Sequence, residues 1–175
     1  MPLAVKILLA GLVILALAWA WVLHRARVAE AAAEAAFPPE GRLLRVGGHQ
    51  VHAVVMGPEA GEAPDLVLIH GASGNTRDMT FSLAPRLAEN YRVIVFDRPG
   101  LGYTDPIEDT GRGILRQAEL LAEAARALGA EAPIVMGHSY GGAVALAWAV
   151  EHPEAISALV AVSAASHPWE SGLST

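Results

Sequence analysis

Gly137, Ser139 and Gly141 form a G-x-S-x-G pattern within residues 133–149, PIVMGHSYGGAVALAWA. An apolar run precedes the serine and a helix-like pattern follows it, so the spacing predicts a sharp strand-to-helix turn. Such a turn lifts a serine hydroxyl clear of a sheet, and the glycines let other segments approach without a Cβ clash. The helix N-terminus adds positive potential for a developing oxyanion. We therefore predict that Ser139 is a nucleophile. The competing interpretation is a Gly-Ser-Gly stretch that only opens a tight turn.

A second candidate element is the stretch HGASGN at residues 70–75, which follows a predicted strand. Gly71 permits an unusual backbone there, and the amide of Ala72 is expected to point toward the serine. Together with the amide of Tyr140 it would offer two donors to the charge that appears on a carbonyl oxygen during attack. The sequence thus predicts an oxyanion hole, with an ordinary glycine-rich turn as the alternative.

The elements that position these residues alternate between strands and helices. A Gly47-Gly48 pair between two β-prone runs predicts a hairpin. Continuous apolar runs rich in Val and Ile are typical of strands buried on both faces. The expected order after the hairpin is strand 65–71, helix 76–90 with a turn or kink near Pro85, strand 91–97, helix 114–129, strand 133–138, helix 140–152 and strand 156–163. This alternation predicts an α/β fold with a mainly parallel sheet, whose ligands sit beyond the carboxyl ends of the strands.

The first 25 residues predict a membrane anchor. Residues 7–23 carry no charge, and the run 3–23, interrupted only by Lys6, would form a helix of roughly 31 Å, about the thickness of the bilayer's hydrocarbon core. Trp19 and Trp21 resemble an interfacial aromatic belt. A signal peptide cleaved near Ala18-Trp19-Ala20 and a buried core helix are the alternatives.

The remainder divides into a stalk and a domain. Residues 26–41 begin with strong helix formers and end at Pro38-Pro39, which predicts a spacer, and residues 42–175 are assigned to the α/β domain. Basic residues on the two sides of the anchor balance, so the positive-inside rule does not orient it. We expect a single-pass protein of a bacterial inner membrane that contacts the bilayer through residues 3–23.

Composition excludes several classes of function. Twelve basic and 18 acidic residues give a net charge of −6 without a basic block, which argues against nucleic-acid binding. The absence of cysteine excludes disulfides, a thiolate metal site and a cysteine nucleophile. No metal or cofactor is expected.

The segments HGASGN, FDRPGLGYTD and GHSYGG, in this order, resemble the α/β-hydrolase fold superfamily, particularly its small-molecule esterase-like members. The resemblance covers about residues 40–165, the first six strands of an eight-stranded family sheet. It implies a nucleophilic Ser139 and an oxyanion hole, and a mostly structural Asp97. A serine at the elbow argues against resemblance to epoxide hydrolases and haloalkane dehalogenases. The implied site comprises Ser139, the amides of Ala72 and Tyr140, and the supporting residues His70, Gly71, Gly137, His138 and Gly141.

The general base is not evident among the seven histidines. His138 is expected to pack or hydrogen bond, and His49 and His52 to lie far from the site, which leaves His167 as the one local candidate. Asp97 and Asp105 precede the serine, whereas the resembled family has the order Ser, acid, His. We therefore expect the acid and the histidine beyond Thr175, in a longer hydrolase of which this chain is the N-terminal part.

The predicted function is a membrane-anchored serine hydrolase of small-molecule esters, thioesters or related acyl bonds, acting through an acyl-enzyme. Without base and acid the 175-residue chain would be nearly inactive. Two alternatives remain open. One is a non-catalytic binding or scaffold protein with the same fold, and the other is a parent enzyme of the peroxidase-like or carbon-carbon bond hydrolase type.

Overall fold

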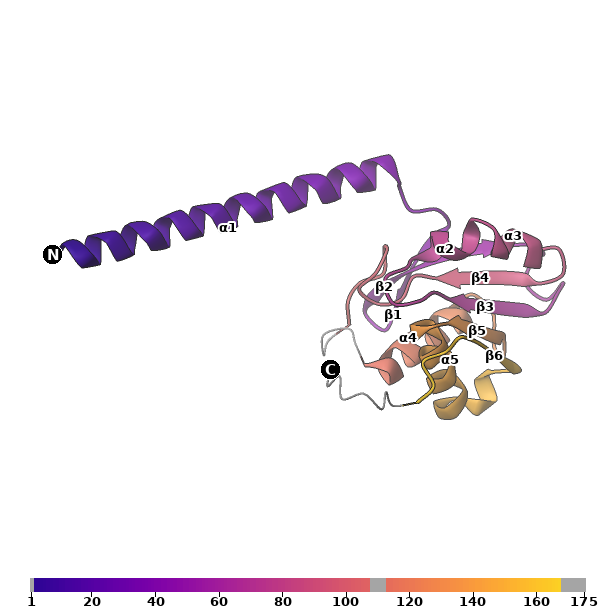
Figure 1. The fold of residues 1–175 in the computed structure, drawn as a ribbon. Helices are drawn as coiled ribbons and strands as arrows, with labels where there is room; N and C mark the ends of the chain where they lie inside the picture. Colours follow the sequence, from indigo (N-terminus) through magenta and orange to yellow (C-terminus); the bar gives the residue numbers. More distant parts are fainter. Residues whose placement is uncertain (1, 108–112, 168–175) are drawn as a thin grey trace. The chain divides into compact units, whose positions relative to one another are not determined.

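A computed structural model of the protein describes residues 2–107 and 113–167. The chain divides into two compact units, Met1–Pro39 and Glu40–Thr175. The elements, labelled in Figure 1, are α1 (Leu3–Ala36), β1 (Arg42–Val46), β2 (His49–Met56), β3 (Asp65–Ile69), α2 (Thr76–Thr80), α3 (Leu83–Leu87), β4 (Arg92–Phe96), α4 (Ile114–Ala127), β5 (Ile134–His138), α5 (Tyr140–Glu151), the 3₁₀ turn η1 (Pro153–Ala155) and β6 (Ala158–Val162).

The first unit is the single helix α1, which has no buried residue. It runs without interruption from the apolar segment through most of the predicted stalk, because residues 24–36 are rich in Ala and Glu, which favour helix. The amide of Phe37 closes the last turn on the carbonyl of Ala33, and Pro38 and Pro39 cannot continue it.

The second unit is built on a six-stranded sheet in the order β1-β2-β4-β3-β5-β6. The strands β4, β3, β5 and β6 are parallel, while β2 pairs antiparallel with both β1 and β4. The predicted α/β class and mainly parallel sheet are confirmed. In the register of the parallel strands Ile69 pairs with Phe96 and with Gly137, so the residues that follow β3, β4 and β5 lie at one edge of the sheet.

Helices cover both faces of this sheet (Figure 1). On one face α4 and α5 pack in a core that includes Phe96, Leu121 and Trp148. On the other face α2 and α3 pack against Leu68 and Val95 in a second core. The two cores hold the strands in a fixed register, which in turn fixes where each loop leaves the sheet.

The helix expected over residues 76–90, with a turn or kink near Pro85, is divided into two short helices, α2 and α3, and the break lies at residues 81–82. Asn75 caps α2 by accepting a hydrogen bond from the amide of Arg77 at 2.8 Å. At Ser82 the backbone leaves the helical region, with φ −146° and ψ −42°. A continuous helix would require Pro85 to donate an amide hydrogen that it lacks, which accounts for a break ahead of it.

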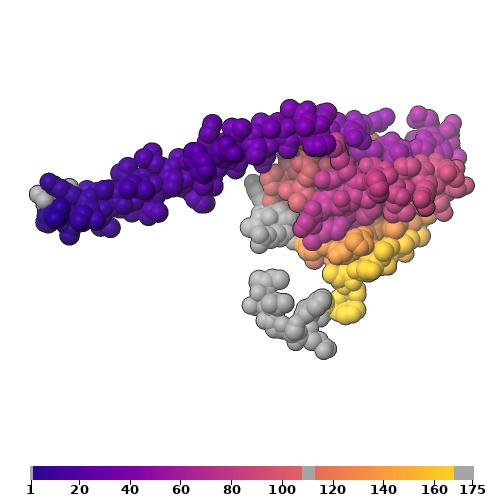
Figure 2. Space-filling model, turned by 45° about the horizontal axis from the view of Figure 1, so that its top comes forward, coloured from indigo at the N-terminus to yellow at the C-terminus, as the bar shows by residue number. Residues whose placement is uncertain are grey.

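The strand β6 ends the sheet with little cover. Its pattern Ala-Leu-Val-Ala-Val is apolar, yet Leu159 and Val160 are 36% and 40% exposed. Figure 2 shows the yellow segment that contains β6 at the surface of the unit. An apolar edge strand offers unpaired backbone groups to another strand.

Candidate active site

Ser139 occupies the turn between β5 and α5 in a backbone conformation that side chains rarely adopt. Its φ is 54° and its ψ −118°, and Ser163 is the other non-glycine residue with positive φ among the described residues. The turn is held by hydrogen bonds at both ends of the residue. The amide of Ser139 donates to the carbonyl of Val162 at 3.0 Å, and its carbonyl accepts from the amides of Gly142 and Ala165 at 3.0 and 3.2 Å. Outliers of this kind cluster at functional sites.

The glycines around the serine leave no room for a side chain. A Cβ on Gly137 would overlap the carbonyl oxygen of Gly141, and a Cβ on Gly141 would overlap the carbonyl oxygens of Ile69 and His70. The start of α5 therefore packs directly on the end of β3. This close approach brings the loop that follows β3 against Ser139.

Gly71 is the member of that loop nearest to the serine. A Cβ placed on Gly71 would lie 3.5 Å from the Cβ of Ser139 and 3.3 Å from Nδ1 of His138. Ala72, the next residue, is exposed, and its amide donates no hydrogen bond to any described residue. The structure thus places Gly71 beside Ser139 and His138, three residues that the sequence had grouped in one site, and Ala72 is the chain neighbour of Gly71.

His70 connects this loop to the end of β4. Its Nδ1 donates to the carbonyl of Gly71 at 2.9 Å, and its Nε2 accepts from the amide of Arg98 at 3.0 Å. One nitrogen donates and the other accepts, so the ring is neutral. Burial lowers the pKa of His70 below its ordinary value, and the Arg98 charge acts in the same direction, against smaller opposing contributions.

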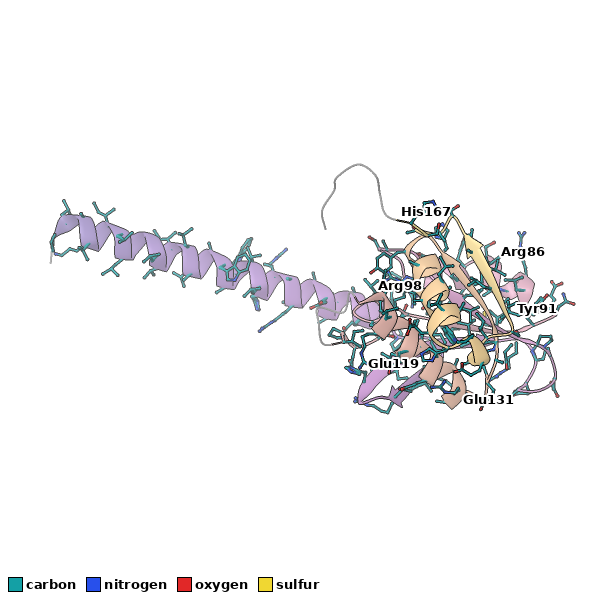
Figure 3. All side chains as sticks on the ribbon, turned by 90° about the horizontal axis from the view of Figure 1, so that it is seen from below. Arg86, Tyr91, Arg98, Glu119, Glu131 and His167 are labelled. Carbon is teal, nitrogen blue, oxygen red and sulfur yellow. The ribbon has the colours of Figure 1, made fainter. Side chains whose placement is uncertain are left out.

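The Arg98 guanidinium is buried at the same place and binds three successive carbonyl oxygens. Nε donates to His70 at 3.1 Å, and Nη2 donates to Gly71 at 2.8 Å and to Ala72 at 2.9 Å. The remaining nitrogen, Nη1, donates to Oε1 of the buried Gln117 at 3.1 Å. Figure 3 labels Arg98 within the α/β unit. Sequence reasoning missed this residue, although two charged residues that close an apolar strand are a signal of a buried polar network.

Asp97 is the centre of a second buried network. Its carboxylate accepts hydrogen bonds from the amide of Thr76 at 2.6 Å, from the amide of Tyr103 at 3.0 Å and from Nδ1 of His52 at 2.7 Å. The other ring nitrogen of His52 contacts the carbonyl oxygen of Glu40. Each ring nitrogen faces an oxygen that can only accept a hydrogen bond, so both nitrogens carry a proton and His52 is an imidazolium.

Two opposing effects set the pKa values of this pair. Burial alone would lower the pKa of His52 and raise that of Asp97, but their mutual hydrogen bond, together with contacts to Glu40, Tyr103 and Thr76, reverses both directions. The pKa of His52 is raised and that of Asp97 is lowered. The expectation that His52 lies far from the site edge is wrong, because β2 runs beside β4 and places the ring on Asp97.

None of the described histidines contacts the Ser139 hydroxyl. His138 is exposed, and His167, the local candidate, is exposed and pairs through Nδ1 with Oγ of Ser166 at 2.8 Å (Figure 3). Asp105 accepts from the amide of Gln50 at 2.8 Å. Within residues 2–107 and 113–167 no group of three or more His, Asp or Glu side chains is arranged to hold a metal ion.

A pocket of about 330 Å³ opens beside the loop and the turn. Asp78 and His138 are the polar side chains among its lining residues, and four of the others are apolar side chains. Its lining residues are Gly71, Asp78, Met79, Leu83, Met136, His138 and Val162. The arrangement as a whole offers a half-buried serine, backbone amides in the adjoining segments and an apolar recess.

A parallel sheet with a strained serine between strand and helix defines the class of this domain. Residues 64–174 match the family model described as alpha/beta hydrolase fold. The chain belongs to this family.

Individual relatives cover several hydrolase chemistries. The chain is 33% identical over 106 residues to the 2-hydroxy-6-oxo-6-phenylhexa-2,4-dienoate hydrolase of Comamonas testosteroni. The matched region covers 58% of this chain and 37% of that protein. It is 29% identical over 125 residues to epoxide hydrolase B of Mycobacterium tuberculosis, covering 70% of this chain and 35% of that protein. The similarity therefore extends to an epoxide hydrolase, against which the serine had argued.

Among solved structures, a bacterial membrane phospholipase A superposes with a TM-score of 0.63 at 28% identity, covering 88% of this chain and 50% of that chain. The present chain spans half or less of the length of each of these three proteins. At the level of the family, the relatives support a hydrolase.

Proposed function

We propose that this chain carries the nucleophile and oxyanion hole of a membrane-anchored serine hydrolase that cleaves carboxylic esters or related acyl bonds. The observation that carries the proposal is Ser139 at φ 54°, between glycines whose missing side chains let the loop 70–72 approach it. A strained, half-buried serine at a strand-to-helix turn has no evident structural use. Its side chain forms no capping hydrogen bond to α5.

The proposed reaction begins with attack of Ser139 Oγ on the carbonyl carbon of the ester. The amides of Ala72 and Tyr140 donate hydrogen bonds to the oxygen that becomes negative, and α5 points its N-terminus at the same place. A general base takes the Ser139 hydroxyl proton and passes it to the leaving alcohol as an acyl-enzyme forms at Ser139; water then attacks the acyl-enzyme, releases the acid and restores the hydroxyl. We assign the general base and its carboxylate to residues outside 2–107 and 113–167, because no described histidine forms a hydrogen bond with the Ser139 side chain.

The apolar pocket supports an apolar acyl group in the substrate. Its lining by Met79, Leu83, Met136 and Val162 adjoins Gly71, next to the nucleophile. Burial of each methylene there would contribute about 0.8 kcal/mol. The resemblance to a membrane phospholipase A agrees with an ester that has an apolar chain.

Membrane attachment through α1 is part of the proposal. Within the described residues α1 is the one helix that is long and apolar enough to cross a bilayer, with a mean hydropathy of 2.4 over its most apolar window, though an N-terminal signal sequence has the same properties. Its 34 residues exceed the roughly 20 that span a bilayer, so the part after residue 23 would project as a stalk. Retention of the intact N-terminus in membranes washed with sodium carbonate supports the anchor, and a mature protein that begins after Ala20 refutes it.

A carbon-carbon bond hydrolase is the second candidate, and the identity to the phenylhexadienoate hydrolase favours it. A non-catalytic binding protein is the third, because no described histidine forms a hydrogen bond with the Ser139 side chain. The prediction that the chain is the N-terminal part of a longer hydrolase stays a prediction, and the reading frame downstream of the codon for Thr175 tests it.

Hydrolysis of p-nitrophenyl esters of increasing chain length by the protein purified from its own membranes tests the proposal. We expect turnover that rises with chain length and falls on the order of 10⁵-fold or more in Ser139→Ala. Turnover that persists in Ser139→Ala would refute the nucleophile. Turnover of a vinylogous 1,5-diketone with none of any ester would favour the carbon-carbon alternative.

A further inference from the structure

Arg98 uses its charge in an unusual way for a buried cation. It is 4% exposed, and no carboxylate among the described residues forms an ion pair with it. Its hydrogen bonds go instead to the carbonyls of His70, Gly71 and Ala72 and to Gln117. A buried cation that has no ion pair is costly, so its partners must be held firmly.

The three carbonyl contacts fix the direction of the amides in the same loop. The described chain has no cis peptide bond. In a trans peptide group the carbonyl and the next residue's N–H point in opposite directions. Because the carbonyls of Gly71 and Ala72 point at Arg98, the amides of Ala72 and residue 73 point away from it. Gly71 lies against the Cβ of Ser139, so the amide of Ala72 belongs to a peptide group next to the serine.

The same guanidinium also contacts Tyr140, the residue whose amide is the second predicted donor of the oxyanion hole. Its central carbon lies 4.6 Å from the centroid of the Tyr140 ring, a cation–π distance. The backbone amide of Arg98 is held by Nε2 of His70 at 3.0 Å, and Gln117 of α4 holds Nη1. One rigid cation therefore joins the loop 70–72, the first residue of α5 and helix α4.

We propose that Arg98 is the positioning residue of the oxyanion hole: it holds the peptide groups of residues 70–72 and the ring of Tyr140 so that the amides of residues 72 and 140 converge. This inference rests on the proposed function and adds a residue to it. The positive charge also polarises the peptide groups whose amides face the substrate. Arg98 contacts no substrate and transfers no proton.

The test compares Arg98→Lys with Arg92→Lys in the protein purified from its own membranes. Arg92 is a matched control, because it is also buried, at 5% exposure, and binds Asp65 at 2.9 Å and the carbonyl of Leu128 at 2.6 Å. It lies at the opposite end of β4 from Arg98. A lysine keeps the charge in both variants but cannot reproduce the planar fork of the guanidinium.

Two measurements separate positioning from general stability. In Arg98→Lys we expect kcat for ester hydrolysis to fall on the order of 10²-fold to 10³-fold with KM changed less than about threefold, because the lost donors act on the transition state. Hydrogen exchange of two hydrogen-bonded amides should rise about tenfold or more in this variant: that of Gly74, which donates to the carbonyl of Gly71, and that of residue 98, which donates to Nε2 of His70. Arg92→Lys should change neither. If Arg98→Lys does not fold, Gln117→Leu should show the same pattern with a fall on the order of 10-fold.

The outcomes distinguish this inference from the proposed function. An active wild type with Arg98→Lys indistinguishable from Arg92→Lys, in kcat or in loop exchange, overturns the role of Arg98 alone. A fall in kcat that is matched by a proportional rise in KM also overturns it. A wild type that hydrolyses no ester in a Ser139-dependent manner refutes the proposed function and the role of Arg98 with it.

Discussion

Replacing Ser139 with glycine should stabilise the α/β domain, whereas replacing it with alanine should not. At φ 54° and ψ −118° a side chain carries backbone strain of roughly 1–3 kcal/mol, which glycine does not. Glycine also gives the unfolded chain more conformational freedom, which offsets about 0.5–1 kcal/mol of the stability gained by removing the strain. Since the Ser139 side chain forms no capping bond, alanine keeps the strain and loses no hydrogen bond to the helix. The expected difference between the two variants is about 1 kcal/mol in favour of Ser139→Gly.

Urea unfolding of the full chain in mild detergent measures this difference. Trp148 is 1% exposed in the core of the domain, so its fluorescence reports on domain unfolding. With a slope of about 2 kcal/mol per molar urea, the midpoint of Ser139→Gly should lie about 0.5 M above that of Ser139→Ala. A midpoint of Ser139→Gly equal to or below that of Ser139→Ala would show that no strain is stored at the turn, and the structural argument for a nucleophile would fail.

Three further predictions concern the residues around the turn. At pH 6, Asp97→Asn should lower the free energy of unfolding by about 3 kcal/mol, because it leaves the buried His52 imidazolium without its counter-charge. A loss below about 1 kcal/mol in urea titrations would contradict the ion pair. The folded-state pKa of His52 is raised above 6.5, so its contribution to stability is complete below pH 6.5 and is lost as pH rises through the folded-state value. Between about pH 7 and 9 the free energy of unfolding of the wild type should fall with a slope of at most about 1.4 kcal/mol per pH unit, and that of His52→Gln should fall less steeply. Equal slopes in the two proteins would refute this assignment. Gly141→Ala should destabilise the domain by about 3 kcal/mol or more, because the new Cβ overlaps the carbonyl oxygens of Ile69 and His70 at the end of β3. A thermal midpoint equal to that of the wild type would show that the start of α5 does not contact the end of β3.

Much of the fold could be predicted because its elements carry strong local signals. The continuous Val-rich and Ile-rich runs of β3 and β4 are typical of buried parallel strands, and the Gly47-Gly48 pair marks the hairpin between β1 and β2. The helix α4 ends near Gly129, whose φ of +83° is the left-handed conformation expected of a C-terminal glycine. A turn or kink was expected near Pro85, but the full division of α2 from α3 at Ser82 was not, because the hydrophobic pattern continues across the break.

The candidate site could be predicted only in part. The nucleophile and the loop 70–72 are adjacent to glycines at strand ends, and parallel strands bring such ends together regardless of sequence distance. Arg98, Gln117 and His52 were missed because their partners are backbone carbonyls or come from other strands and helices, and no spacing within the sequence encodes such contacts. Asp97 was expected to be structural, and its three hydrogen bonds agree with that interpretation.

Labelling of the protein in its own membranes with a fluorophosphonate tests the central claim most directly, because the reagent phosphonylates a serine only where its hydroxyl is activated beside an oxyanion hole. Mass spectrometry of the peptide that spans residues 133–149 should find the phosphonyl group on Ser139, and the Ser139→Ala protein should remain unlabelled. An unmodified Ser139, in membranes whose other serine hydrolases react with the reagent, would contradict the account.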